Sequence, residues 1–322
     1  MNSINTRADF ALVFPGQGSQ SVGMVTALAN QFSEVRQRFD SASQVLGSDL
    51  WDLVANGPED ALNRTENTQP AMLAASVATW DIWINTTGIR PQYMAGHSFG
   101  EYTALVCAGA LEFETAIGLV AERGRYMQDA VPAGQGAMAA ILGLELAALN
   151  AVCAEASLEG GECSCANLNA PGQIVIAGHG GTIDRACELA IKAGAKRAIR
   201  LPISVPAHCQ LMRPAAQRLK ERLLMTEFAA SHTNVIHNAD VAMHRDSDAI
   251  RDALVRQLHS PVRWIETIEY FVAHGISVVA ECGPGKVLTA LIKRIDRNLR
   301  TVSLGASEDF AHLGALMTAG RA

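Results

Sequence analysis

The stretch that decides the fold reads YMAGHSFGEYTALVCA and covers residues 93–108. A short apolar run ends in a glycine-rich turn at 96–100, and apolar residues at helical spacing follow through 104–108. The pattern predicts a strand, a tight turn and a helix. A serine in Gly-x-Ser-x-Gly on such a turn projects its oxygen above a sheet, next to a helix N-terminus that favours negative charge. Ser98 is therefore the candidate nucleophile.

The same order of elements is expected at two other places. Residues 10–14 form an apolar run that leads into Pro-Gly-Gln-Gly at 15–18, and residues 278–280 lead into a Gly-Pro-Gly turn. A helix pattern follows that second turn over residues 287–295. Strand, tight turn and helix, repeated along a chain, indicate a parallel sheet covered by helices, so we predict an α/β fold.

Residues 136–203 carry a different order of elements. Strands are expected at 137–142, 163–168, 173–177 and 197–203, with helices at 146–156 and 183–193. The order β-α-β-β-α-β is that of a ferredoxin-like unit. Because α/β segments lie on both sides of it, we predict a small ferredoxin-like domain over residues 133–203. It is inserted into a large domain made of residues 1–132 and 204–322.

Composition excludes several classes of function. Of the 322 residues, 49 % are hydrophobic and 18 % are charged, and the formal net charge is -6. This balance is typical of a globular protein, and the charges form no basic block for nucleic-acid binding. The first nine residues are polar, and no apolar run approaches the roughly 20 residues of a membrane span. We therefore expect neither a signal peptide nor a membrane anchor.

The cysteines bear on the compartment and on metals. Seven cysteines, an odd number, are scattered along the chain. This usage favours a reduced, cytoplasmic compartment over a disulfide framework. Cys163 and Cys165 alternate on one predicted strand, but no second cysteine pair completes a four-ligand zinc set, so no metal is expected.

A nucleophilic serine needs a base within hydrogen-bond reach. Nine histidines are available. His208 is favoured because it follows an apolar strand that ends in Pro-Ala-His, although the residues alone do not decide among the nine. His97 is adjacent to Ser98, but neighbours on a tight turn point apart, so His97 is interpreted as a packed or hydrogen-bonded support residue.

One arginine lies at the border of a predicted apolar helix face. Residues 114–130 have an apolar stripe at helical spacing, and Arg123 falls at its edge while Arg125 points to the opposite side. A guanidinium at the edge of a core needs an anionic partner. From the residues alone, a surface arginine that extends its charged end into solvent is the commoner interpretation.

The chain resembles the malonyl-CoA:acyl carrier protein transacylases of fatty acid synthesis and their polyketide relatives. The matching motifs span nearly the whole chain in the family's order. They are FPGQGSQ (14–20), TQPA (68–71), GHSFGE (96–101), ERG (122–124), GAMAA (136–140), NLNAPGQ (167–173), VPAH (205–208) and ECGPG (281–285). Together they are far more specific than any one of them alone.

The resemblance implies an α/β-hydrolase-like core with an inserted ferredoxin-like domain, in agreement with the pattern above. It implies that Ser98 is acylated and that His208 is its base. The imidazole would be oriented by a main-chain carbonyl near Gln257 and not by an aspartate. The backbone N–H groups of Gln17 and Phe99 would form the oxyanion hole.

The resemblance also implies the substrates. The family's matching arginine, here Arg123, grips the free carboxylate of the malonyl group, because a planar guanidinium binds a carboxylate with two parallel donors. The reaction implied is a ping-pong transfer from malonyl-CoA to the phosphopantetheine thiol of an acyl carrier protein. No cofactor is implied beyond the coenzyme A thioester, which is a substrate.

Two motif positions depart from the commonest bacterial form, and alternatives stay open. Phe99 stands where leucine is usual, and Ala207 where serine is usual, so tolerance for substituted malonyl groups is undecided. A free-standing polyketide acyltransferase acting in trans would carry the same motifs. An acyl hydrolase on the same fold would not need Arg123. A non-catalytic module would not need to keep Ser98, His208 and Arg123.

Overall fold

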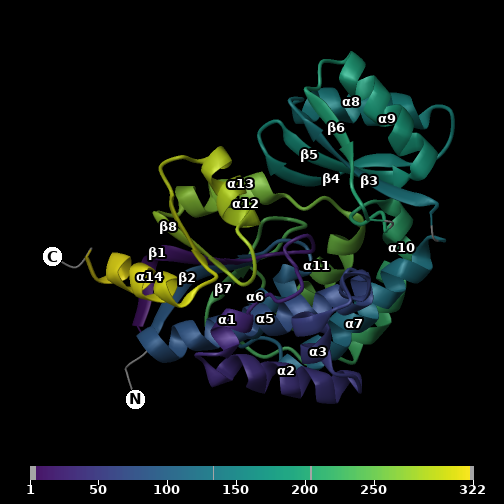
Figure 1. Cartoon of the computed structure of the whole chain (residues 1–322). Helices are drawn as coiled ribbons and strands as arrows, with labels where there is room; N and C mark the ends of the chain where they lie inside the picture. The colour runs from purple at the N-terminus through teal and green to yellow at the C-terminus, as the bar shows by residue number, and fades with distance from the viewer. Residues whose placement is uncertain (1–4, 133, 204, 320–322) are drawn as a thin grey trace.

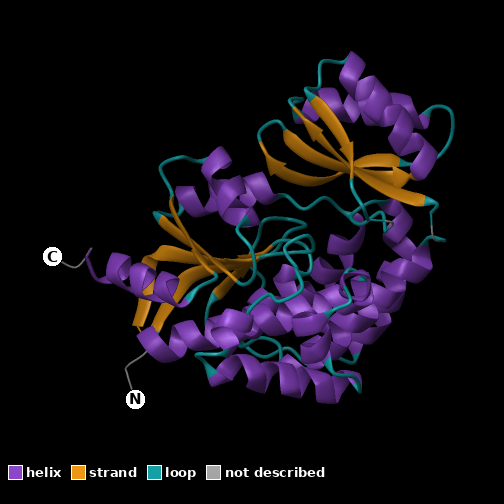
Figure 2. Cartoon of the chain, viewed as in Figure 1, coloured by secondary structure: helices purple, strands orange, loops and turns teal. Residues whose placement is uncertain are grey.

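The chain folds around two sheets of different kind (Figures 1 and 2). The structure, a computed structural model, describes residues 5–132, 134–203 and 205–319. A parallel sheet and its covering helices make up the larger part. A smaller antiparallel sheet with two helices lies to one side of it. The predicted α/β fold is confirmed.

The large sheet contains the three strands expected beside glycine turns. Its order is β7-β2-β1-β8-β9, and every neighbouring pair is parallel. The strands are β1 (Asn5–Phe14), β2 (Ile89–Gly96), β7 (Asn234–Ile236), β8 (Val278–Cys282) and β9 (Arg300–Leu304). The carboxyl ends of parallel strands share one edge of a sheet, so the turns after β1, β2 and β8 meet there.

Helices cover both faces of this sheet, which is why residues 10–14 of its central strand are all apolar. Along β1, Phe10, Leu12 and Phe14 pack into one core, whereas Ala11 and Val13 pack into another. The first core includes α5 and α7, and the second includes α12 and α13. The helices before the small sheet are α1 (Thr26–Ala29), α2 (Ser33–Leu46), α3 (Leu50–Asn56), α4 (Glu59–Leu62), α5 (Thr65–Thr87), α6 (Gly100–Cys107) and α7 (Phe113–Ala130). Those after it are η1 (Gln210–Met212), α10 (Arg213–Leu224), α11 (Ser247–His259), α12 (Trp264–Ala273), α13 (Val287–Ile295) and α14 (Ser307–Ala319).

The small sheet has the order β4-β5-β3-β6 and is antiparallel throughout. Its elements are β3 (Gly136–Leu142), α8 (Leu146–Ser157), β4 (Cys163–Ala170), β5 (Gln173–His179), α9 (Gly180–Lys192) and β6 (Arg197–Arg200). Both helices pack on one face of it with the core residues of the strands. The domain boundaries at 132/133 and 203/204 stay a prediction, and Ala133 and Ser204 lie outside the described residues.

One strand is shorter than expected. The sequence predicts a strand over 197–203, but β6 ends at Arg200. Pro202 has no N–H to donate to a neighbouring strand, so the pairing cannot continue through it. The backbone instead turns away, and Leu201 and Ile203 line the cavity beside Ser98.

No helix within the described ranges combines the length and the apolar composition that crossing a bilayer requires.

Candidate active site

Ser98 lies on the sharp turn between β2 and α6, as the sequence predicts. Its backbone has a φ of 56°, in the left-handed region that non-glycine residues rarely adopt. The turn is tight because its glycines leave no room for side chains. A Cβ on Gly96 would lie 1.8 Å from the carbonyl carbon of Gly100, and one on Gly100 would lie 2.5 Å from the carbonyl oxygen of Phe14.

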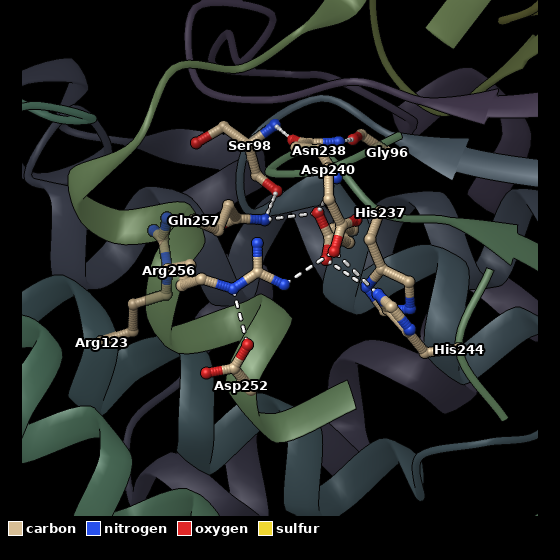
Figure 3. Close-up of polar contacts among 11 residues, drawn as sticks. Gly96, Ser98, Arg123, His237, Asn238, Asp240, His244, Asp252, Arg256 and Gln257 are labelled. Atoms are coloured by element: carbon tan, nitrogen blue, oxygen red, sulfur yellow. Dashed lines mark hydrogen bonds and ion pairs between the residues drawn. The ribbon is translucent and has the colours of Figure 1, made fainter. Parts of the chain in front are cut away.

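The side chain of Asn238 holds this turn closed (Figure 3). The backbone N–H of Ser98 donates to Asn238 Oδ1 at 2.8 Å, and Asn238 Nδ2 donates to the carbonyl of Gly96 at 2.7 Å. Asn238 is fully buried and follows β7, the strand that neighbours β2. The two bonds satisfy the N–H of the strained residue and the carbonyl two residues before it, which keeps that conformation in place.

His208 makes the hydrogen bond that a base for Ser98 needs. Ser98 Oγ lies 2.6 Å from His208 Nε2, and His208 Nδ1 lies 2.7 Å from the carbonyl oxygen of Gln257. Because a carbonyl can only accept, Nδ1 carries the proton and Nε2 is free to accept from the serine. Burial, assisted by the positive charge of Arg123, lowers the pKa of His208 to about 3, so its imidazole is neutral at pH 7.

Arg123 is buried, not exposed to solvent as its place at the edge of the apolar stripe suggests. Its relative exposure is 1 %, whereas Arg125 is exposed. The reason is close packing of α7 against α5, since a Cβ on Gly124 would lie 2.6 Å from Glu66 Cα. At this distance the guanidinium reaches Gln69 on α5, and the interpretation as a surface arginine was wrong.

The hydrogen-bond partners of Arg123 are neutral. One terminal nitrogen donates to Gln69 Oε1 at 3.0 Å and approaches Met127 Sδ at 3.2 Å, and the other donates to Gln257 Oε1 at 3.0 Å. The carbon of the guanidinium lies 5.7 Å from the ring centroid of Tyr102. Burial lowers the pKa of Arg123, and nearby Tyr102 and Glu101 oppose that effect. Arginine stays protonated at pH 7 in proteins, so the cavity holds a positive charge.

Gln17 and Phe99 are the two residues whose backbone N–H groups are expected to form the oxyanion hole. Both line the same cavity as Ser98. The loop after β1 closely approaches the turn at residues 96–101, because a Cβ on Gly16 would lie only 2.7 Å from the carbonyl oxygen of His97. Within the described ranges, neither the Gln17 N–H nor the Phe99 N–H donates to a protein acceptor. Both groups are therefore available to a ligand.

His97 has partners of its own other than Ser98 and His208. Its Nε2 lies 2.8 Å from Asn169 Oδ1, and its ring meets the Trp264 ring edge-on at a centroid distance of 5.4 Å. This geometry agrees with the interpretation of His97 as a packed and hydrogen-bonded support residue.

A cavity of about 170 Å³ joins these groups. Ser98, His208 and Arg123 line it from the side of the large sheet. Met138 and Val175 line it from the small sheet, so both parts of the molecule enclose the site. The small sheet thus contributes two apolar walls, together with the polar residues Asn167 and Asn169 of β4, whereas Ser98, His208 and Arg123 come from the rest of the chain.

Three residues of the site have no role predicted from sequence, namely Gln69, Glu101 and Asn238. Gln69 and Glu101 lie inside motifs that carry the family resemblance, but a motif does not say which residues touch. Asn238 follows a short strand that the pattern does not reveal. A signal that could have found it is the polar run His-Asn-Ala-Asp at 237–240, which directly follows the buried residues Val235 and Ile236.

The cysteines do not form a metal site in the part of the chain that the structure describes. There, no three side chains of histidine, cysteine, aspartate or glutamate are grouped as metal ligands. Cys163 and Cys165 lie on β4 and pack with Cys153 of α8 in the core of the small sheet.

Comparisons with known proteins agree along nearly the whole chain. The family model of the acyl transferase domain matches residues 11–308. The malonyl CoA-acyl carrier protein transacylase of Salmonella typhimurium is 50 % identical over 309 residues, which are 96 % of this chain and 99 % of that protein. The corresponding protein of Escherichia coli K12 is 52 % identical over 295 residues, 92 % of this chain and 95 % of its own length.

Solved structures show the same fold. The malonyl CoA-acyl carrier protein transacylase of Coxiella burnetii matches with a TM-score of 0.95 at 49 % identity, covering 96 % of this chain and 98 % of that one. A malonyl-transacylase solved in complex with a type II polyketide synthase acyl-carrier protein matches with a TM-score of 0.94 at 48 % identity. That match covers 96 % of this chain and 99 % of that one.

Proposed function

The chain belongs to the acyl transferase family of malonyl CoA-acyl carrier protein transacylases, and from that premise we propose that it moves a malonyl group from coenzyme A to an acyl carrier protein through an ester on Ser98. Malonyl-CoA is the donor and the phosphopantetheine thiol of the carrier protein is the acceptor. The transfer is ping-pong, because each thiol occupies the same site in turn.

The first half-reaction uses the bond between Ser98 and His208. Ser98 Oγ attacks the thioester carbonyl carbon while His208 Nε2 takes the hydroxyl proton, over the 2.6 Å that separate the two atoms. The tetrahedral intermediate then collapses, the carbon–sulfur bond breaks, and the imidazolium returns its proton to the departing coenzyme A thiolate. In the second half-reaction the carrier thiol attacks the Ser98 ester and the same proton transfers run in reverse.

Backbone groups of Gln17, Phe99 and Gln257 support this chemistry. The backbone N–H groups of Gln17 and Phe99 bind the negative oxygen of each tetrahedral intermediate, where fixed donors in a dry site are most effective. The carbonyl of Gln257 accepts from His208 Nδ1 at 2.7 Å and keeps the imidazole in the tautomer that can receive the serine proton. All these groups belong to the chain, so we propose that no cofactor is needed.

The observation that carries the malonyl assignment is the buried Arg123 in the cavity of Ser98. A buried cation is costly unless it is paired. Among the described residues, its hydrogen-bond acceptors are two amide oxygens and a thioether sulfur and include no carboxylate. A malonyl carboxylate supplies the missing negative charge and accepts two parallel hydrogen bonds.

The ester is tested by mass spectrometry of the intact protein. Incubation with malonyl-CoA alone should release free coenzyme A and add one malonyl group, which maps to the peptide that contains Ser98. Ser98→Ala should show no adduct. An unchanged adduct in that variant would assign the ester to another residue, and rapid loss of the adduct without carrier protein would favour the acyl hydrolase.

A second candidate is a malonyl or substituted-malonyl transferase that serves a polyketide synthase in trans. The malonyl-transacylase solved with a type II polyketide carrier protein favours it, since that enzyme is 48 % identical to this chain. Transfer rates to carrier proteins of the two pathways, and loading by methylmalonyl-CoA, distinguish the candidates.

We propose the cytoplasm as the place of this reaction. All seven cysteines are unpaired, which fits a reducing compartment. A cell fractionation with an antibody against the chain tests the location.

A further inference from the structure

Arg123 lies close to a negative charge that it does not touch. Glu101 on α6 is fully buried, and its Oε2 accepts from the side-chain amide of Gln257 at 2.8 Å. The oxygen of the same amide accepts from Arg123 at 3.0 Å. One amide therefore separates the carboxylate of Glu101 from the guanidinium of Arg123. Figure 3 shows Gln257 beside Arg123 and Ser98.

Other donors fix the carboxylate of Glu101. Its Oε1 lies 2.7 Å from His237 Nδ1, and its Oε2 also accepts from the backbone N–H of Asn238 at 2.9 Å. With these bonds Glu101 cannot turn toward Arg123 without leaving buried donors unpaired, which costs free energy. The separation between carboxylate and guanidinium is thus built into the fold.

This separation has a consequence for substrate binding. A carboxylate in direct contact with Arg123 would stabilise the buried cation but would also occupy the donors that a malonyl carboxylate needs. A neutral amide between them passes on part of the stabilisation and leaves the guanidinium with weaker partners, because an amide oxygen lacks the opposite charge that a carboxylate brings to the same donors. Arg123 Nε has no acceptor among the described residues, which agrees with a donor set left open for an anion.

We propose that Glu101 is the counter-charge of Arg123, acting through the side-chain amide of Gln257, and that this one-amide separation sets the preference for malonyl over uncharged acyl groups. The inference rests on the proposed function and adds two positioning residues to it. The carboxylate of Glu101 and the side-chain amide of Gln257 together form the Glu101–Gln257 support of Arg123.

The support also touches the reacting groups, which decides how it must be tested. Gln257 Nε2 donates to the carbonyl of Ser98 at 2.9 Å, and the Gln257 carbonyl holds His208. A disturbed Gln257 would lower turnover with every acyl-CoA. Only a change in the ratio of malonyl to acetyl loading, measured as kcat/KM for each thioester, reports on the counter-charge.

The decisive variant moves the negative charge one side chain closer to Arg123. The double substitution Glu101→Gln with Gln257→Glu keeps the net charge and an amide–carboxylate hydrogen bond, but its carboxylate contacts Arg123 directly. We expect the ratio of malonyl to acetyl loading to fall about ten-fold or more, the scale of close buried charge pairs, with most of the change in KM for malonyl-CoA. If the support had a purely structural role, the double substitution would lower kcat/KM equally for both thioesters.

A second measurement does not depend on turnover. In a Ser98→Ala background, Glu101→Gln should lower the melting temperature because the buried guanidinium loses its counter-charge. Malonyl-CoA should then raise the melting temperature by more than it does without Glu101→Gln, since its carboxylate replaces the lost charge. Acetyl-CoA should show no such gain.

The matched control is Glu122→Gln, which neutralises the carboxylate next to Arg123 in sequence. Glu122 pairs with Arg222 at 2.7 Å near the surface and should leave the loading ratio unchanged. A wild-type ratio in the double variant, or equal melting gains with both thioesters, would overturn the inference. Arg123→Ala distinguishes a failure of this inference from a failure of the proposed function. If the ratio of malonyl to acetyl loading is unchanged in that variant as well, the proposed carboxylate site itself is wrong.

Discussion

The two residues that meet above the sheet are both strained, yet they lie in regions of opposite character. Ser98 has a φ of 56° and His208 a φ of 64°. The elbow, residues 96–101, joins a strand to a helix and is fixed by its glycines and by Asn238. The His208 segment, residues 205–209, lies between β6 and η1 and has no regular structure of its own.

One helix end holds both regions. Gln257 Nε2 donates to the carbonyl of Ser98, and the Gln257 carbonyl accepts from His208 Nδ1. The backbone N–H of His208 donates to the carbonyl of Leu258 at 3.0 Å. The nucleophile is held by Asn238 and its glycine turn in addition to Gln257, whereas the base depends on the last turn of α11. Strain of roughly 1–3 kcal/mol at each residue persists because these contacts over-determine it.

The largest expected effect in this comparison is the loss of the base. His208→Ala should lower the rate constant for acylation of Ser98 by about two to four orders of magnitude, the usual contribution of general acid–base catalysis. Rapid-quench measurement of the first turnover with malonyl-CoA gives this rate without interference from carrier protein.

His97→Ala is the matched control, since it removes the same ring from the elbow itself. Its losses are one hydrogen bond to Asn169 and the contact with Trp264, so the rate should fall much less. If the two costs were reversed, His97 would be the base and His208 a support for the loop.

The contrast between the two regions also explains what the sequence could predict. Strands β1, β2 and β8, helix α13 and the elbow follow from local patterns of apolar residues and glycines. His208 could not be selected from its segment alone, because its partners lie in α11, some fifty positions away in the chain. The role of the Gln257 carbonyl came only from the family resemblance, and Asn238 was missed because β7 is too short to give a pattern.

A smaller effect is expected at Arg123, and it concerns selectivity. Arg123→Ala should lower the ratio of malonyl to acetyl loading by about one to two orders of magnitude, since the variant loses a buried charge-assisted contact with the substrate. Arg123→Lys should recover part of the ratio, because one ammonium cannot reproduce two parallel donors. Competition between malonyl-CoA and acetyl-CoA, followed by mass spectrometry of the Ser98 ester, measures the ratio directly.

A constant ratio of malonyl to acetyl loading across wild type, Arg123→Ala and Arg123→Lys would exclude Arg123 from substrate recognition.

The burial of Arg123 could not be predicted from helical periodicity. The residue lies at the edge of the apolar stripe, and whether that edge faces solvent depends on how closely α5 approaches. That distance is set by Gly124 against Glu66, a contact between helices that no local pattern contains.

The smallest expected effect is a pH dependence of the free energy of unfolding, to which His208 contributes and Ser98 does not. Burial lowers the pKa of His208 to about 3, whereas an unfolded histidine titrates near 6.5. Below about pH 6.5 the unfolded chain therefore binds a proton that the native protein does not, so the free energy of unfolding should decrease as pH falls from about 6.5 towards 3. The slope is at most about 1.4 kcal/mol per pH unit. Burial also lowers the pKa values of His97 and His259, so wild type and His208→Gln both lose stability through those two residues. Urea unfolding at pH 7 and pH 5 should therefore show a loss that is about 1–2 kcal/mol larger in wild type and in Ser98→Ala than in His208→Gln. The acylation rate constant should stay level between pH 8 and pH 5, where a base with an ordinary pKa would lose about 30-fold. A rate that falls with a midpoint near pH 6.5 would show that His208 titrates as an exposed histidine does. The proposed difference between a buried base and an elbow that does not titrate would then be wrong.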